Sequence, residues 1–554
     1  MASSVQRRRN AANLSEPMVA RRHRFLRWLP MLILLGGSLL RLVYTVGSDP
    51  RNVYDDHFHV IRIMVREGRW PRPDEGWETY QPPLYHWLGA VVYRAVAGPG
   101  MPPPPYVATP EAASSPHGVP CPYPRHVAGR KAVQLISTLA GIATLGLVWL
   151  ALRRLFPNDY GVQSVGLAFA ALLPRHIYMS GMATNDALTY LWTALCVYSV
   201  LRALPLSSDY SHAAPPARSA KTPGDRGHRT GPPSAQRANP YGWWIAAGLA
   251  AALALWTKQY AVPLLGVLAL LIPAAAWVRQ AEARRVQMRG AAVALALAVL
   301  LGMWPYVRLY RYTGDPLASN VTLRPNNIRD QLPGTVANTS FVSLRLGALL
   351  QYPWTHVETV NSFWTQIYGE LWFDHGTAST IYQYWPWLNH LWPILRDRSL
   401  PGPERDRRGL TWTTDVVHPG LLRQGRVLVA LGLLPTLLCL LGLVTIWRQP
   451  WFVPIGLLIV ATFLAGVATP LLQTLRVPHR CSMKATYALW AFAAFVVLFA
   501  AGWSWLGRQR YAGWLRWVVA VNLGLLAVAV CWHFVDLAVF FPRSPGYFAR
   551  RDPL

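Results

Sequence analysis

Two adjacent carboxylates beside imidazoles form the densest polar cluster in the sequence. Asp55 and Asp56 are followed by His57 and His59, just after the first long apolar run. A carboxylate next to a second acid in a partly desolvated place has a raised pKa and can act as general base on a hydroxyl. Such oxygen and nitrogen atoms also suit a divalent metal, with His57 and His59 as the candidate ligands. A third interpretation is a helix N-cap or a solvated loop.

Further charged side chains stand at the ends of apolar runs. Asp186 begins one run, either as a second acidic site residue or as part of an Asn-Asp helix cap. Lys258 ends another, where a lysine commonly extends its ammonium to the interface. It also fits the cation that a phosphate-bearing ligand requires, a role for which Arg476 and Lys484 are alternatives. Trp364 opens a Trp-rich stretch that suits either a sugar ring or an interfacial aromatic belt.

The composition places these residues in a membrane protein. Of the 554 residues, 53% are hydrophobic and 14% are charged, against about 25% charged in an average soluble protein. Apolar runs of about twenty residues match the length that a helix needs to cross the hydrocarbon core. We expect eleven spans, at approximately residues 26–46, 131–152, 162–180, 186–203, 242–257, 260–278, 290–308, 427–447, 451–470, 485–506 and 512–534.

The basic residues predict the orientation of these spans. The net charge is +28, but the arginines lie between apolar runs, so membrane orientation explains them and a nucleic-acid partner is excluded. Basic residues follow alternate spans, as the positive-inside rule requires if the N-terminus is cytoplasmic. The acidic pair, Asp186 and Lys258 then all fall on the opposite, outer side. This pattern predicts a multi-pass protein of the bacterial inner membrane whose active face is outside.

The same pattern divides the chain into regions. Residues 1–23 form a cytoplasmic basic tail, 24–310 a transmembrane core, 311–426 a large outer loop, 427–534 the C-terminal spans and 535–554 an outer tail. The core contains a first outer loop at 47–130 and a cytoplasmic loop at 205–240, which we expect to be disordered because it has little apolar surface. The short apolar stretch 84–97 either spans or lies in the interface, and we favour the interface.

The order of motifs resembles the GT-C class of membrane glycosyltransferases. The acidic pair is followed by an amphipathic stretch, then Trp70-Pro71, then an aromatic-x-Pro-Pro-Leu-Tyr sequence from Tyr80 to Tyr85. This order is closest to glycosyltransferase family 39, which includes protein O-mannosyltransferases and lipid A aminoarabinose transferases. Later matches, in order, are Leu173-Pro174, Asn185-Asp186, Thr257-Lys258, Ser362-Phe363-Trp364 and Met483-Lys484.

The resemblance implies a fold, a reaction and a set of roles. The fold is all-α and polytopic, with two large outer loops that carry interfacial helices. The reaction moves a sugar from a polyprenyl-phosphate carrier to an acceptor hydroxyl with inversion, with Asp55 as general base and Asp56 and Asp186 in the same cavity. The acceptor is a lipid, a polysaccharide or a protein, and the sugar is a hexose or a pentose. Gln81, Tyr85, Lys258, Arg476, Lys484 and Trp364 are the expected substrate-binding residues.

The sequence also departs from this family, which leaves alternatives open. Aminoarabinose transferases have an acid-Lys pair before the proline, where this chain has Tyr80-Gln81. Their metal ligand and lysine therefore do not transfer, and a bound divalent metal stays uncertain. A transporter or flippase is one rival function, although such proteins carry charged or helix-breaking positions near the middle of the spans. A catalytically inactive member that binds lipid carriers is another.

Overall fold

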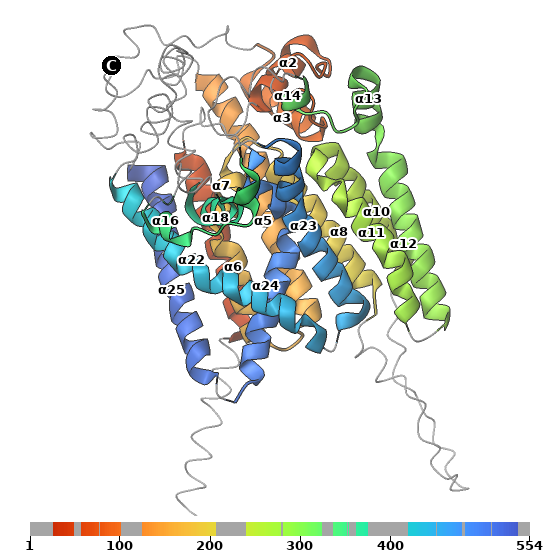
Figure 1. Cartoon of the computed structure of the whole chain (residues 1–554). Coiled ribbons are helices and arrows are strands. Elements are labelled where there is room, and N and C mark those ends of the chain that lie inside the picture. Colours follow the sequence, from red (N-terminus) through yellow and green to blue (C-terminus); the bar gives the residue numbers. More distant parts are fainter. Residues whose placement is uncertain are drawn as a thin grey trace, which may run out of the picture.

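A computed structural model shows the protein as a bundle of long helices (Figure 1). It describes residues 26–48, 57–76, 78–100, 124–205, 240–278, 281–323, 336–351, 353, 362–374, 419–449, 451–478, 482–510 and 512–540. All regular structure within these ranges is helical, as predicted. The predicted disordered loop and most of the second outer loop lie outside them.

Eight helical segments of the described residues are long and apolar enough to cross a membrane. The chain is therefore a multi-pass membrane protein, as its composition predicts. The segments are Leu26–Gly47, Arg125–Leu155, Gln259–Trp277, Ala281–Gly302, Leu422–Arg448, Val453–Arg476, Ala485–Arg508 and Gly513–Ala538. Their main helices are α5 (Pro124–Leu155), α11 (Pro263–Ala274), α12 (Ala281–Gly302), α22 (Pro419–Thr445), α23 (Leu457–Arg476), α24 (Phe492–Arg508) and α25 (Gly513–Val535).

The other three predicted spans correspond to shorter or more polar helices. Two of them, α8 (Asp186–Ala203) and α10 (Pro240–Thr257), have 18 residues each and lie beside the long helices in the bundle (Figure 1). The predicted continuous span 162–180 is wrong, because the chain forms α6 (Tyr160–Leu172) and α7 (Pro174–Gly181) instead. Pro174 has no N–H for the carbonyl four residues earlier, and Leu173 before it is extended.

A buried arginine satisfies the carbonyls that this break exposes. Arg41, in the first span, donates from Nη1 to the Ala171 carbonyl at 3.2 Å and from Nη2 to the Ala170 carbonyl at 3.5 Å. Its Nη2 also lies 2.8 Å from His176 Nδ1. The C-terminal end of a helix attracts a cation because its free carbonyls carry partial negative charge. The arginine inside the first span therefore stabilises the junction of α6 and α7.

Four short helices gather at one end of the bundle (Figure 1). Two belong to the first predicted outer loop, α2 (His57–Glu67) and α3 (Leu84–Ala97), and α14 (Asn320–Leu323) belongs to the second. The fourth, α13 (Trp304–Thr313), includes the end of the predicted span 290–308 and the start of that loop. With 14 residues, α3 is about 21 Å long, too short for a 30 Å hydrocarbon core. It is not among the apolar spans, in agreement with the interfacial position that we favour. The second outer loop also contains the short helices α16 (Leu346–Gln351) and α18 (Phe363–Gly369).

Two glycines let α22 and α24 approach closely. A Cβ on Gly442 would lie 1.8 Å from the Leu498 carbonyl oxygen, and one on Gly502 would lie 2.3 Å from the Leu438 carbonyl oxygen. Small residues at such contacts allow helix backbones to touch in a membrane.

We therefore expect Gly442→Ala to lower the free energy of unfolding by about 1–3 kcal/mol or more, because the added methyl group must separate the helices. The measurement is denaturant unfolding of the reconstituted protein. The control is Gly524→Ala in α25, where a Cβ meets nothing within 4 Å. That variant should be neutral or slightly more stable, since alanine favours a helix. Equal stability of both variants would contradict the close approach of α22 and α24.

Candidate functional site

A buried ion pair joins two of the predicted site residues. Lys258 Nζ lies 2.7 Å from Asp186 Oδ1, and the side chains are only 3% and 2% exposed. The second carboxylate oxygen of Asp186 accepts a hydrogen bond from the Thr184 hydroxyl at 2.6 Å. Charges buried to this extent are retained only when they are paired and hydrogen-bonded. Asp186 is thus both the first residue of α8 and the acid of a buried ion pair, and its role in a functional site stays a prediction.

The ends of two helices bring this pair together. Lys258 directly follows α10 and has an extended backbone, which directs the chain away from the helix axis. Next to Asp186, Asn185 donates from Nδ2 to the Thr257 carbonyl at 3.0 Å and so ties the start of α8 to the end of α10. The hydroxyl of Tyr306, on α13, donates to the Leu255 carbonyl at 3.2 Å. The end of α10, the start of α8 and α13 therefore together fix the position of Lys258.

Two buried imidazoles lie close to the ion pair. His57 Nδ1, on α2, is 3.1 Å from His86 Nε2, on α3, and neither side chain is exposed. Burial lowers the pKa of His57 well below its usual value, and the charges of His86, Lys258 and Lys484 lower it further. Burial also lowers the pKa of His86, to about 3. Both imidazoles are therefore neutral at pH 7, and the two lysines lie near enough to His57 to act on it.

Two tyrosine rings in contact place Lys484 near Lys258. The rings of Tyr260 and Tyr487 lie 4.0 Å apart. Lys258 Nζ is 5.7 Å from the centre of the first ring, and Lys484 Nζ is 5.9 Å from the centre of the second. We call His57, His86, Asp186, Lys258 and Lys484 the central cluster. It carries two cations and one carboxylate among buried neutral groups.

The ring of Tyr85 lies beside the two imidazoles of this cluster, with ring centres 6.3 Å from His57 and 5.8 Å from His86. Its side chain is fully buried, and the Ser137 hydroxyl donates to the phenol oxygen at 3.3 Å. The pKa of Tyr85 is raised chiefly by burial and further by the negative charge of Asp186. The phenol therefore keeps its proton at neutral pH and can donate to an anion. Tyr85 thus lies beside the cluster, and its role in binding substrate stays a prediction.

A second buried ion pair supports the segment that carries Lys484. Arg175 Nη2, on α7, lies 3.5 Å from Glu370 Oε2, and the same oxygen accepts a hydrogen bond from the Ala485 backbone at 2.7 Å. Arg175 Nε also donates to the Thr486 hydroxyl at 2.9 Å. These bonds hold Ala485 and Thr486, the two residues that follow Lys484, in place. Neither Arg175 nor Glu370 is among the predicted site residues, although an arginine directly after Leu173-Pro174 in an apolar stretch is a signal for a buried role.

Three predicted substrate-binding residues have other partners. Arg476 forms an ion pair with Asp315 and donates to the Leu317 carbonyl at 2.9 Å. Trp364 donates from its indole nitrogen to the Phe341 carbonyl at 2.9 Å, with 38% of its surface exposed. Gln81 is buried and donates to Glu78 Oε2 at 3.1 Å. Their roles in binding substrate stay predictions.

The predicted metal ligands do not converge. His57 faces His86, whereas His59 Nε2 lies 3.4 Å from the Glu75 carbonyl and His59 Nδ1 lies 3.4 Å from Arg62 Nη2. Residues two positions apart on a helix point to different faces. Within the described ranges, no three side chains of His, Cys, Asp or Glu form a group that could hold a metal. These residues do not fit a metal site, so we derive the chemistry from side chains alone.

The two acids with which the site prediction begins lie outside the described residues. Asp55 and Asp56 immediately precede His57 in the sequence. His57 is the first residue of α2 and belongs to the central cluster. The role of the acidic pair therefore remains a proposal, supported by this adjacency.

The imidazole pair predicts a pH-dependent stability. Because the pKa values of His57 and His86 are lowered in the folded protein, unfolding takes up protons below about pH 6.5. Stability should be constant above that pH and should fall as the pH drops toward about 3. Titration of one imidazole lowers the free energy of unfolding by up to roughly 2 kcal/mol as the pH falls from 6.5 to 5. Unfolding measured from pH 8 to pH 4 tests this. A double variant, His57→Phe with His86→Phe, should lose less stability at acid pH, and an unchanged slope would contradict the assignment.

Comparison with known proteins gives matches among solved structures only. No protein-family model matches the sequence, and no curated protein does. The oligosaccharyltransferase AglB from Archaeoglobus fulgidus, in complex with an inhibitory peptide and a dolichol-phosphate, is 13% identical over 93% of this chain and 56% of that one, with a TM-score of 0.45. The chain thus spans little more than half the length of that enzyme.

Two further matches are also glycosyltransferases. ArnT from Cupriavidus metallidurans, bound to undecaprenyl phosphate, is 16% identical over 85% of this chain and 77% of that one, with a TM-score of 0.34. The Pmt1-Pmt2 protein O-mannosyltransferase of S. cerevisiae, bound to the sugar donor, is 16% identical over 56% and 38%, with a TM-score of 0.35. These matches belong to the class that the motifs resemble. Because these TM-scores are below 0.5, we base the function on the residues of the site.

Proposed function

We propose that the protein is a membrane glycosyltransferase that moves one sugar from a polyprenyl-phosphate carrier to an acceptor hydroxyl. The observation that carries this proposal is the central cluster. It places a buried lysine, a buried carboxylate and a buried tyrosine beside a second, half-buried lysine, and its His57 directly follows the acidic pair in the sequence. Two lysines and a phenol suit a phosphate, and the adjacent carboxylates suit a general base.

The cluster accounts for binding of the donor phosphate. The Lys258 ammonium is paired with Asp186, so it is fixed in place and still has N–H groups for a second acceptor. Lys484 supplies a second positive charge beside it, and Tyr85 adds a hydroxyl donor. A lipid carrier keeps its tail in the bilayer, so the phosphate must bind where the bundle ends. Preorganised donors in a buried site stabilise the charge that develops on a leaving phosphate.

The transfer step then needs one base. Asp55 takes the proton from the acceptor hydroxyl as its oxygen forms a bond to the anomeric carbon. The bond from that carbon to the phosphate oxygen breaks, and the electron pair leaves with polyprenyl phosphate on the opposite face. The configuration therefore inverts. Holding both reactants in one cavity lowers the barrier by several kcal/mol through positioning alone.

The main rival function is transport of a lipid-linked substrate. A transporter places charged or helix-breaking positions near the middle of its spans. Here the lysines and Asp186 lie at helix ends, and the buried arginine of the first span, Arg41, binds helix-end carbonyls. This distribution favours chemistry at one end of the bundle over passage through it.

The test is turnover in proteoliposomes. Purified full-length protein is offered a panel of radiolabelled polyprenyl-phosphate sugars with lipid, polysaccharide and peptide acceptors. Wild-type protein should cleave one donor and label one acceptor, and Lys484→Met should slow that reaction by at least tenfold. Movement of intact donor between leaflets without cleavage would identify a transporter. Donor binding without cleavage or movement would identify an inactive carrier-binding member.

A further inference from the structure

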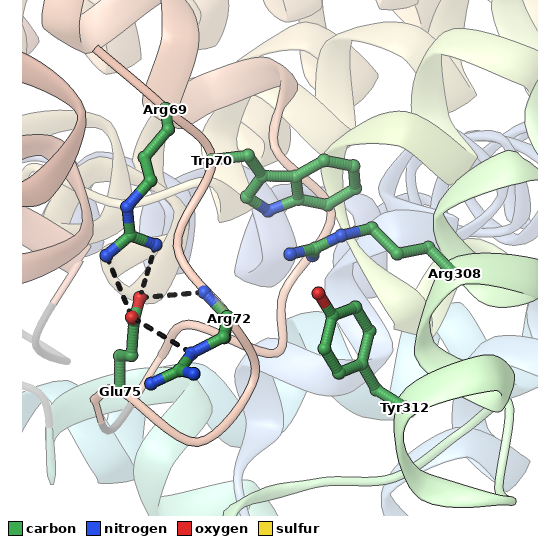
Figure 2. A pocket seen from close by; sticks show the side chains of 6 residues that line it. All are labelled: Arg69, Trp70, Arg72, Glu75, Arg308 and Tyr312. Atoms are coloured by element: carbon green, nitrogen blue, oxygen red, sulfur yellow. Dashed lines mark hydrogen bonds and ion pairs between the residues drawn. The ribbon is translucent and has the colours of Figure 1, made fainter. Parts of the chain in front are cut away.

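A second polar pocket lies at the same end of the bundle, separate from the central cluster. Its volume is about 500 Å³. Figure 2 shows the side chains that line it: Arg69, Trp70, Arg72, Glu75, Arg308 and Tyr312. The first four come from the loop that follows α2, and the last two come from α13. None of these residues takes part in the proposed transfer.

One carboxylate organises two of the arginines. Arg69 forms two parallel hydrogen bonds with Glu75, at 2.9 and 2.8 Å. Arg72 donates to the same carboxylate from its backbone at 2.8 Å and from Nε at 3.2 Å. The hydrogen bond from Arg69 is the main reason that the pKa of Glu75 falls to about 2. Glu75 is therefore ionised and has its oxygens occupied. Arg69 also pairs with Glu67 at 2.5 Å, and Arg72 lies 3.7 Å from Asp74.

Arg308 adds a third guanidinium without a carboxylate of its own. It lies 3.8 Å from the centre of the Trp70 ring and donates from Nη2 to the Pro71 carbonyl at 2.8 Å. Among the described residues, no acid forms an ion pair with it, and the Trp70 indole nitrogen has no hydrogen-bond partner. Arg308 and the Trp70 indole thus offer N–H groups that no carboxylate occupies among the described residues. Guanidinium groups in such an arrangement suit the oxygens of a phosphate.

The surroundings of the pocket indicate that the phosphate belongs to a lipid. Trp70 contacts Trp87 with ring centres 6.3 Å apart, and Trp87 contacts Trp256 at 5.8 Å. This row of rings leads from the pocket to the end of α12, where Leu300 and Leu301 are 78% and 48% exposed. Exposed apolar side chains on a membrane protein contact acyl chains, and tryptophans lie at the headgroup level.

We propose that this pocket binds the phosphate of a glycerophospholipid whose acyl chains lie along the row from Trp87 to Leu301. The phosphate is recognised by N–H groups and not by net charge, because Glu67 pairs with Arg69 and Asp74 with Arg72, beside Glu75. The bound phosphate would hold α13 against the loop after α2. Because the Tyr306 hydroxyl of α13 also bonds to backbone carbonyls just before and at Lys258, the lipid would support the central cluster from outside.

The test is lipid retention by the purified full-length protein, measured by native mass spectrometry after delipidation and addition of one ligand at a time. The ligands are phosphatidylglycerol, phosphatidylcholine, undecaprenyl phosphate and inorganic phosphate. Arg308→Met should lower phosphatidylglycerol binding at least tenfold. Arg311→Met is the matched control, because this arginine is on the same helix but lies beside Trp304, outside the pocket. It should bind as wild type does.

A second variant separates binding from folding. Arg72 lies on the opposite wall and its side chain is 58% exposed, so Arg72→Met leaves α13 intact and should weaken phosphatidylglycerol binding about threefold. Equal retention by wild type, Arg308→Met and Arg72→Met would overturn the proposal. So would inorganic phosphate that displaces the lipid at equal concentration, which would make this a free-phosphate site. Binding of undecaprenyl phosphate alone, dependent on Arg308, would overturn it by making the pocket part of the donor site.

Discussion

Replacing Asp55 with asparagine should slow glycosyl transfer by about a thousandfold and leave donor binding nearly unchanged. Asparagine has the shape of aspartate but cannot take a proton from the acceptor hydroxyl. The loss therefore appears in the transition state, as a lower kcat with a similar KM for the donor. The measurement is initial-rate kinetics in proteoliposomes with the donor that the panel identifies.

A matched substitution in the same predicted outer loop controls for charge and folding. The Asp74 side chain is 70% exposed and lies outside the central cluster. Asp74→Asn removes one carboxylate from the same region and should retain transfer within about twofold. If Asp55→Asn were as active as Asp74→Asn, the general base would have to be another residue.

Breaking the Lys258–Asp186 pair should have the largest effect on stability. Each single substitution, Lys258→Met or Asp186→Leu, leaves an unpaired charge in a buried place, which typically costs about 3–5 kcal/mol. The double variant removes both charges and should be much less destabilised than the sum of the single changes. The measurement is the free energy of unfolding of all four proteins in the same lipid, analysed as a double-mutant cycle.

An exposed ion pair provides the comparison for this cycle. Arg476 pairs with Asp315, and both side chains are 36% exposed. Solvent screens such a pair, so Arg476→Met should cost less than about 1 kcal/mol. If Lys258→Met were no more destabilised than Arg476→Met, the lysine would not be held in a buried ion pair.

The long spans were predictable because their signal is local. Runs such as 26–46 and 427–447 exceed the length of the hydrocarbon core and contain few charges. The same rule joined 162–180 into one span, although the Leu173-Pro174 step ends a helix. It also extended 290–308 through the break between α12 and α13, where Pro305 follows Trp304. The helix breaks are therefore visible in the prolines but not in hydropathy.

The site was predictable in part. The order of motifs along the chain indicates Asp186, Lys258, Lys484 and Tyr85, and these lie in or beside the central cluster, while their roles stay predictions. The distances between these side chains depend on packing between segments that are far apart in the sequence. No local sequence pattern indicates such packing. The same reason explains why Glu370 and Arg175, almost 200 residues apart, were missed. It also explains why Arg476, a plausible cation by type, proves to be paired with Asp315.

The most direct test of the central claim is a single-turnover reaction that follows both products. Wild-type protein in proteoliposomes receives one equivalent of the intact donor that the panel identifies as its substrate, together with an excess of acceptor. We predict that one polyprenyl phosphate appears for each sugar transferred, with inverted configuration at the anomeric carbon. Sugar transfer with retained configuration, or loss of donor without a labelled acceptor, would contradict the proposed mechanism, and no cleavage of any donor would contradict the glycosyltransferase function itself.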